Sequence, residues 1–181
     1  NTNMTMTISS SNNNGNVLPL RYYAGGFIGE IYCNTNMIMT ISNSTNNGNV
    51  TGWDYVGGFV GQIYSSSVSN FVSLFIINSA NKGSVSAKSG MACGVSCVCP
   101  ERNFNVNTTI LNSINKGSVN AWGNAFGITN NVTKARNVVS MGKVTASSSS
   151  FSFWNVSTDV DLFFGLKSKC KNCGANATLF E

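Results

Sequence analysis

One sequence feature constrains this fold more than any other: a unit of roughly 34 residues that recurs along most of the chain. Residues 1–17 match residues 34–50 at fourteen of seventeen positions, which marks an internal duplication. Each copy centres on an Asn-x-Gly-x-Val turn, decayed in the last copy, with glycines at Gly15, Gly48, Gly83, Gly117 and Gly142. The glycines are 33, 35, 34 and 25 residues apart. A period of this size is typical of a solenoid, a propeller or a repeat array.

The residues around each turn glycine repeat as well. An apolar residue stands seven positions before it, and a valine stands two positions after it, so we expect both to face inward. The apolar residues are Ile8, Ile41, Ile76, Ile110 and Ala135. Glycine suits a sharp corner that needs a positive φ, and asparagine tolerates a neighbouring left-handed conformation. The turn asparagines of successive coils are expected to stack into a ladder of amides.

Two further segments complete each unit. One appears at 23–31 and 55–63 and fades at 92–95, 125–128 and 163–166; the other is clearest at 37–41 and 71–76. Short strands rich in Val, Ile, Phe and Thr, separated by Gly, Asn and Ser, are what a β-solenoid coil requires, and no stretch has convincing helical spacing. The sequence therefore predicts an all-β fold, a β-solenoid (β-helix) of about four to five coils.

Two short sequences carry a family resemblance. The cores Gly-Phe-Ile-Gly at 26–29 and Gly-Phe-Val-Gly at 58–61, each after an Asn-x-Gly-x-Val turn, resemble the GLUG-type repeats of large secreted and surface-attached proteins. The match is good for two copies, about residues 9–63, and partial for two more. The resemblance implies a β-solenoid in an extracellular, often adhesive, protein, and it offers no catalytic residues.

The last part of the chain has a different composition. A polar run at 147–150 precedes several aromatic residues and the Cys170-x-x-Cys173 pair. A terminal coil needs cover, because it otherwise exposes strand edges and an open core. We therefore predict a repeat β-solenoid over residues 1–144 and a capping segment over residues 145–181.

Composition indicates an oxidising compartment. Only 9% of the residues are charged, 28 are Asn, and the six cysteines are an even number. The disulfide candidates are Cys33, Cys93, Cys97, Cys99, Cys170 and Cys173. Seven Asn-x-Ser/Thr sequons make Asn3, Asn43, Asn49, Asn107, Asn131, Asn155 and Asn176 candidates for N-glycosylation. Together these features predict a secreted, disulfide-bonded glycoprotein of the extracellular space or cell surface.

The cysteines also admit a second interpretation, a zinc site. Cys93, Cys97 and Cys99 together with the Cys170/Cys173 pair offer enough thiolates for four-coordinate zinc, but only one of the spacings is finger-like. Disulfides are the favoured interpretation, although six cysteines allow fifteen pairings. Cys97 and Cys99 are two apart in an expected strand, so they face the same way and should bond elsewhere. We expect no metal and no cofactor.

Catalytic chemistry has little support. The chain contains no His, which removes Ser/His/Asp and Cys/His catalysis and the usual zinc-enzyme ligand sets. A carboxylate pair for glycoside hydrolysis is conceivable at Asp159 and Asp161, or at Glu30 and Asp54 if their coils stack. With six acidic residues and no repeated placement, a polysaccharide-cleaving enzyme is the least favoured alternative, and we expect no enzymatic activity.

Binding surfaces have two candidates. Tyr22, Tyr23, Trp53 and Tyr55 form a potential aromatic strip for sugar stacking, although Tyr23 and Tyr55 occupy equivalent repeat positions and structural stacking explains them as well. Residues 1–80 carry a net charge of −1 and residues 81–181 a net charge of +6. No Lys/Arg run with interleaved aromatic residues appears, so we expect scattered solvated lysines and no nucleic-acid partner.

The sequence thus favours an extracellular structural or adhesive repeat protein, a surface rod or filament subunit, with glycan binding as the alternative function. Its longest apolar run, Phe71–Ile77, is far short of the ~20 residues that a membrane span needs. The sequence begins inside a repeat, so we expect an open N-terminal coil that self-associates end to end or contacts other surface proteins.

Overall fold

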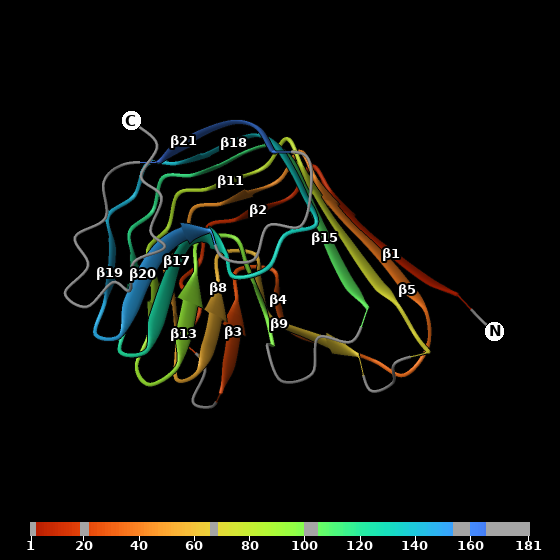
Figure 1. Cartoon of the computed structure of the whole chain (residues 1–181), viewed down its shortest axis with the longest axis horizontal. Helices are drawn as coiled ribbons and strands as arrows, with labels where there is room; N and C mark the ends of the chain where they lie inside the picture. Colours follow the sequence, from red (N-terminus) through yellow and green to blue (C-terminus); the bar gives the residue numbers. More distant parts are fainter. Residues whose placement is uncertain (1–2, 19–21, 66–68, 100–104, 154–159, 166–181) are drawn as a thin grey trace.

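The computed structural model describes residues 3–18, 22–65, 69–99, 105–153 and 160–165. Within these residues the regular structure is entirely β-strand, and the strands pair in parallel from coil to coil. Figure 1 shows the coils stacked from β1 (Met4–Ser9) at one end to β21 (Val160–Gly165) at the other. The prediction of an all-β solenoid is confirmed.

Successive coils reuse the same set of strands. The first contains β1, β2 (Asn12–Asn13), β3 (Tyr23–Gly25) and β4 (Ile28–Cys33). The second contains β5 (Met37–Ser42), β6 (Thr45–Asn46), β7 (Val50–Gly52), β8 (Tyr55–Gly57) and β9 (Val60–Ser65). The third contains β10 (Val72–Ile77), β11 (Ala80–Asn81), β12 (Val85–Ala87), β13 (Met91–Cys93) and β14 (Ser96–Val98). Then follow β15 (Val106–Asn115), β16 (Val119–Ala121), β17 (Asn124–Thr129), β18 (Lys134–Ser140), β19 (Val144–Ala146), β20 (Ser149–Phe153) and β21.

These strands build three parallel sheets. Sheet A stacks β1, β5, β10, β15, β18 and β21, and around a corner it stacks β2, β6, β11 and the end of β15. Sheet B stacks β7, β12, β16 and β19. Sheet C holds β3, β8, β13, β17 and β20, with β4, β9 and β14 beside them. Figure 1 shows β3, β8, β13 and β17 side by side, away from the long strands β1 and β5.

The register of sheet A confirms the predicted inward positions. The apolar residues seven positions before each turn glycine align in one column through the pairs Ile8–Ile41, Ile41–Ile76, Ile76–Ile110 and Ile110–Ala135. The members from Ile41 to Ala135 are buried, and Ile8 in the first coil is half-buried. The valines two positions after each glycine align likewise in sheet B.

The core has two main lobes with a polar waist between them. The larger lobe packs sheet A against β4, β9 and β14 and includes Met39, Ile63 and Leu74. The smaller lobe packs sheet B against β3, β8 and β13. Between the lobes, Asn81 lies against Gly58, where a Cβ would collide with its amide group. The second glycine of each Gly-Gly pair is therefore needed because a carbonyl oxygen and an asparagine side chain of the next coil occupy the space.

These waist asparagines form the predicted ladder. Asn13 Nδ2 donates to Asn46 Oδ1 at 2.8 Å, Asn46 Nδ2 to Asn81 Oδ1 at 2.8 Å, and Asn81 Nδ2 to Asn115 Oδ1 at 2.7 Å. The last three asparagines are fully buried, and each also donates to the carbonyl of the glycine two residues on. Almost every polar group of the ladder is thus satisfied inside the core, as a buried amide requires.

The predicted reason for the turn glycines is wrong. None of the described glycines has a positive φ. Glycine is needed instead because a Cβ at Gly48, Gly83, Gly117 or Gly142 would overlap the carbonyl oxygen of the turn glycine in the preceding coil. The left-handed corner lies five residues before each glycine, at Ser10, Asn43, Asn78, Asn112 and Asn137, with φ between 48° and 53°.

The last coils depart from the sequence alignment in two places. The decayed copy expected at 163–166 is misaligned, because β21 pairs with β18 in sheet A, with Phe163 opposite Val138. The equivalent of the Gly-Phe segment is β20, where Phe151 pairs with Phe126. The 25-residue step between glycines arises because the single strand β17 pairs with both β13 and β14, meeting β14 at Thr129, and residues 130–133 then lead directly into β18.

The predicted cap also begins too early. Both β20 and β21 extend existing ladders in parallel beyond residue 144. Sheet A consequently stacks six strands, and the coil count differs slightly from the four to five expected. Residues 166–181, the rest of the predicted capping segment, lie outside the described residues.

Candidate functional site

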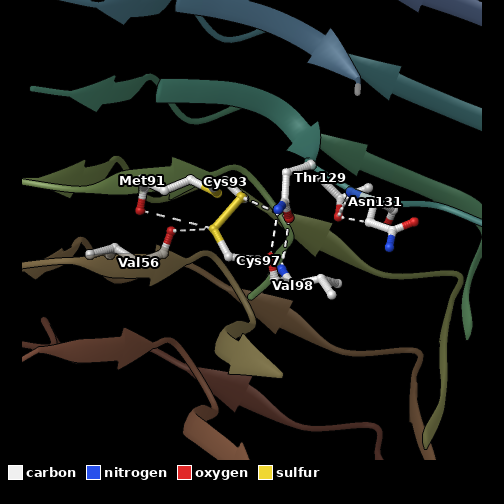
Figure 2. The surroundings of a disulfide bond; sticks show 8 residues. Val56, Met91, Cys93, Cys97, Val98, Thr129 and Asn131 are labelled. Atoms are coloured by element: carbon white, nitrogen blue, oxygen red, sulfur yellow. Dashed lines mark hydrogen bonds between the residues drawn. A yellow bond between two sulfur atoms is a disulfide. The ribbon is translucent and has the colours of Figure 1, made fainter. Parts of the chain in front are cut away.

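A disulfide joins Cys93 at the end of β13 to Cys97 in β14, with Cα atoms 5.5 Å apart (Figure 2). Cys93 pairs in register with Gly57, and Cys97 follows Ser96, which pairs with Val60. The two cysteines thus occupy a bend where the preceding coil has glycines. Cys97 Sγ lies 3.5 Å from the carbonyl oxygen of Val56. This bond was among the predicted disulfide candidates, and it agrees with the expectation that Cys97 and Cys99 do not pair.

The remaining cysteines are separate from this bond. Cys33 is buried, its Sγ lies 3.0 Å from Met37 Sδ, and burial raises the pKa of its thiol. Cys99 is buried and, within the described chain, not disulfide-bonded. Cys170 and Cys173 lie outside the described residues. In the part of the chain that the structure describes, no three His, Cys, Asp or Glu side chains gather as a metal site would require.

Asn130 is a structural residue that sequence reasoning did not single out. It is 6% exposed; its Oδ1 accepts from the backbone N–H of Val98 at 2.7 Å, and its Nδ2 donates to the Val98 carbonyl at 2.6 Å. The side chain thereby replaces a strand pair next to the disulfide, where the register between β14 and β9 shifts. Asn130 directly follows Thr129, which pairs with Ser96 of β14, and only this pairing places its side chain beside Val98.

The sequons differ in exposure. Asn3, Asn43, Asn49 and Asn107 are exposed, and Asn131 is half-buried. Asn155 and Asn176 lie outside the described residues. Exposure permits glycosylation, which stays a prediction.

The predicted aromatic strip divides in two. Tyr23 and Tyr55 lie in sheet C and Tyr22 directly precedes it, with ring centroids 6.0 Å apart in the pairs Tyr22–Tyr23 and Tyr23–Tyr55. Tyr23 and Tyr55 pair in register and are half-buried, as the structural interpretation expected. Trp53 is 53% exposed at the corner between sheets B and C.

Trp53 belongs to a set that we call the corner column: Trp53, Lys88 and Trp122. They directly follow Gly52, Ala87 and Ala121 of sheet B. These three residues stack in register from coil to coil, Gly52 with Ala87 and Ala87 with Ala121. All three side chains are exposed. Sequence reasoning missed Lys88 and Trp122, although each corner-column residue stands five positions after a turn glycine.

The carboxylate pair Glu30 and Asp54 is not stacked. Glu30 in β4 pairs with Gln62, whereas Asp54 donates its backbone N–H to the carbonyl of Tyr22 at the other end of sheet C. Stacking therefore does not bring these two acids face to face, and the interpretation that depended on it is wrong. Asp159 lies outside the described residues, and of Asp161 only the backbone in β21 is described.

The lysines of the middle coils flank the strands of sheet B. Lys82 and Lys116 precede turn glycines, Lys143 follows one, and Lys88 lies in the corner column; all four are exposed. The four sheet B segments are 47–53, 82–88, 116–122 and 141–147, and they contain four lysines, two tryptophans and no Asp or Glu. We call their outer surface the sheet B face. Stacking of the coils brings together, on one cationic surface, lysines that are far apart in the sequence.

Among the described residues no helix is long and apolar enough to cross a membrane. Comparison of the chain with protein-family models, with curated proteins and with solved structures finds no match.

Proposed function

We propose that this chain is a non-enzymatic extracellular structural or adhesive repeat protein, a stiff rod that acts at a surface or as a filament subunit. The observation that carries the proposal is the continuous in-register stacking of coils around a buried amide ladder. In such a stack each coil contacts mainly its neighbours, so the body extends in one direction and presents flat faces for repeated weak contacts.

The filament version rests on the edge of β1. Within the described chain no strand pairs with the outer edge of β1, and its Met4 and Met6 are 57% and 42% exposed although they stack in register on the buried Met37 and Met39. Backbone N–H groups of Met4 and Ser10 point toward the second coil. By alternation, the N–H of Thr7 points away from it and is available to another coil.

Sedimentation velocity over a wide concentration range tests the filament version. We expect the full chain to associate as its concentration rises, and Thr7→Pro to abolish association while the melting temperature stays unchanged, because proline removes only an outward donor. Thr40→Ala, at the paired position one coil inward, is the matched control and should still associate. A strictly monomeric chain, or association that survives Thr7→Pro, would overturn this version.

A further inference from the structure

The corner column presents two large aromatic side chains with a cation between them. Trp53 and Trp122 are 53% and 68% exposed, unusual for a residue type that is mostly buried. Because neighbouring parallel strands lie about 4.8 Å apart, the pairing of Gly52, Ala87 and Ala121 sets the two tryptophans roughly 9.6 Å apart along the solenoid axis. Lys88 lies midway between them.

A row of polar side chains runs beside the corner column on the sheet B face. Two residues before each column member lies Thr51, Ser86 or Asn120, on the same side of its strand. These side chains are at least partly exposed. Each step along the column therefore combines a ring or an ammonium group with a hydroxyl or amide group that is able to hydrogen-bond a ligand hydroxyl.

The charge of the sheet B face selects an anion. Lys82, Lys116 and Lys143 lie on its far side and add to Lys88, and the four segments contain no acidic residue. The nearest acid in sequence, Asp54, has its carboxylate packed against Gly90 of the next coil. A long anionic ligand therefore meets a face whose segments carry four lysines and no acidic residue, which favours its association.

We propose that the corner column binds an acidic polysaccharide lying along the solenoid axis. Sugar rings stack on Trp53 and Trp122, and the carboxylate or sulfate of the intervening sugar pairs with Lys88. Aromatic rings stack on the apolar faces of sugars while the neighbouring polar row bonds their hydroxyls. The inference deepens the proposed function, on which it rests, by naming the partner chemistry of an adhesive surface.

A polysaccharide fits better than a nucleic acid. The column offers one cation for each pair of rings, whereas single-stranded nucleic acids are bound in grooves that follow a charge on every nucleotide. Carboxylated and sulfated glycans share the chemistry that Lys88 recognises. Single-stranded DNA is therefore included as a competing ligand in the test.

The test measures binding of the full chain, made without N-glycans because a glycan on Asn49 would lie on the same face. The ligands are polygalacturonate, its methyl ester, heparin and oligo-dT, measured by calorimetry at fixed salt. We expect polygalacturonate or heparin to bind more tightly than the methyl ester and oligo-dT. Trp122→Ala should weaken polygalacturonate binding about tenfold, the equivalent of ~1.4 kcal/mol. Lys88→Gln should weaken it about fivefold and leave binding of the methyl ester unchanged.

Matched controls lie on other faces. Tyr32→Ala removes an exposed aromatic side chain of β4, and Lys134→Gln removes an exposed lysine of β18; both should bind like the unchanged protein. The inference is overturned if no acidic glycan binds, if oligo-dT binds most tightly, or if the control and column variants lose equal affinity. None of these outcomes changes the sedimentation result for Thr7→Pro, so failure of this inference is distinguishable from failure of the filament proposal.

Discussion

The waist between the two core lobes and the bend between β13 and β14 pack neighbouring coils against each other in different ways. At the waist, every coil from the second to the fourth places an asparagine against a glycine. At the bend, glycines of the second coil give way to the bonded pair Cys93 and Cys97 in the third, and Asn130 clamps Val98 from the fourth. At the waist, a backbone carbonyl and an asparagine side chain of the next coil leave no room for a Cβ, so only glycine fits. At the bend, a cysteine of the third coil stands in register with a glycine of the second, so more than one residue type fits.

The largest effect should come from adding one methyl group to a stacked turn. In Gly83→Ala the new Cβ collides with the Gly48 carbonyl oxygen, a backbone atom that cannot turn aside. We expect a loss of about 4 kcal/mol in the free energy of unfolding, at the upper end of overpacking effects, measured by urea denaturation. Gly15→Ala is the matched control, since its Cβ would meet only Asn13 Oδ1 at 3.8 Å. Equal losses in both variants would show that the stacking argument fails.

Removing one amide from the waist should cost slightly less. Asn81→Ala leaves the Nδ2 group of Asn46 and the Oδ1 atom of Asn115 without their ladder partner. An unpaired buried polar group costs about 1–3 kcal/mol, so we expect a loss of about 3 kcal/mol in thermal unfolding. The exposed Asn47, which donates to Asn14 Oδ1 at 2.8 Å, provides the control Asn47→Ala, expected to lose less than about 0.5 kcal/mol. A similar loss in both would place the stabilisation outside the buried ladder.

The bend should tolerate change better than the waist. The Cys93–Cys97 bond closes a short loop, so breaking it removes only about 2 kcal/mol of chain-entropy stabilisation. We expect a reductant to lower the melting temperature modestly and to have no such effect on the Cys93→Ala/Cys97→Ala double variant. Complete unfolding on reduction would make the bend as critical as the waist.

The smallest predicted effect is a gain. Ser140 pairs in register with Asn115, and within the described part of the chain its buried Oγ has no hydrogen-bond partner. Ser140→Asn extends the ladder by one amide that accepts from Asn115, and Gly127 opposite leaves room for it. We expect a gain of about 1 kcal/mol in denaturant unfolding. The control Ser140→Ala should not gain stability through this bond, and a destabilised Ser140→Asn would show that the fifth coil differs in shape.

The fold was largely predictable because stacking makes sequence period and spatial period the same. The inward column from Ile8 to Ala135 and the asparagine ladder both follow from equal spacing to the turn glycines. The candidate site was predictable only in part. Trp53 was predicted as part of an aromatic strip for sugar stacking, but its partners Lys88 and Trp122 are 35 and 69 residues from it in sequence, and Lys88 is not aromatic.

The sequence by itself thus determined the repeat, the all-β fold class and which positions face inward, because the repeat period and the alternation of apolar and polar residues are properties of the residue order. Only the tertiary structure decided why the turn residues are glycine, since the obstructing atom belongs to another coil. It also decided that Cys93 bonds Cys97 and that Phe163 aligns with Val138, because both depend on the number of residues in each corner. The sheet B face likewise exists only after stacking, which brings four lysines and two tryptophans from separate coils onto one surface.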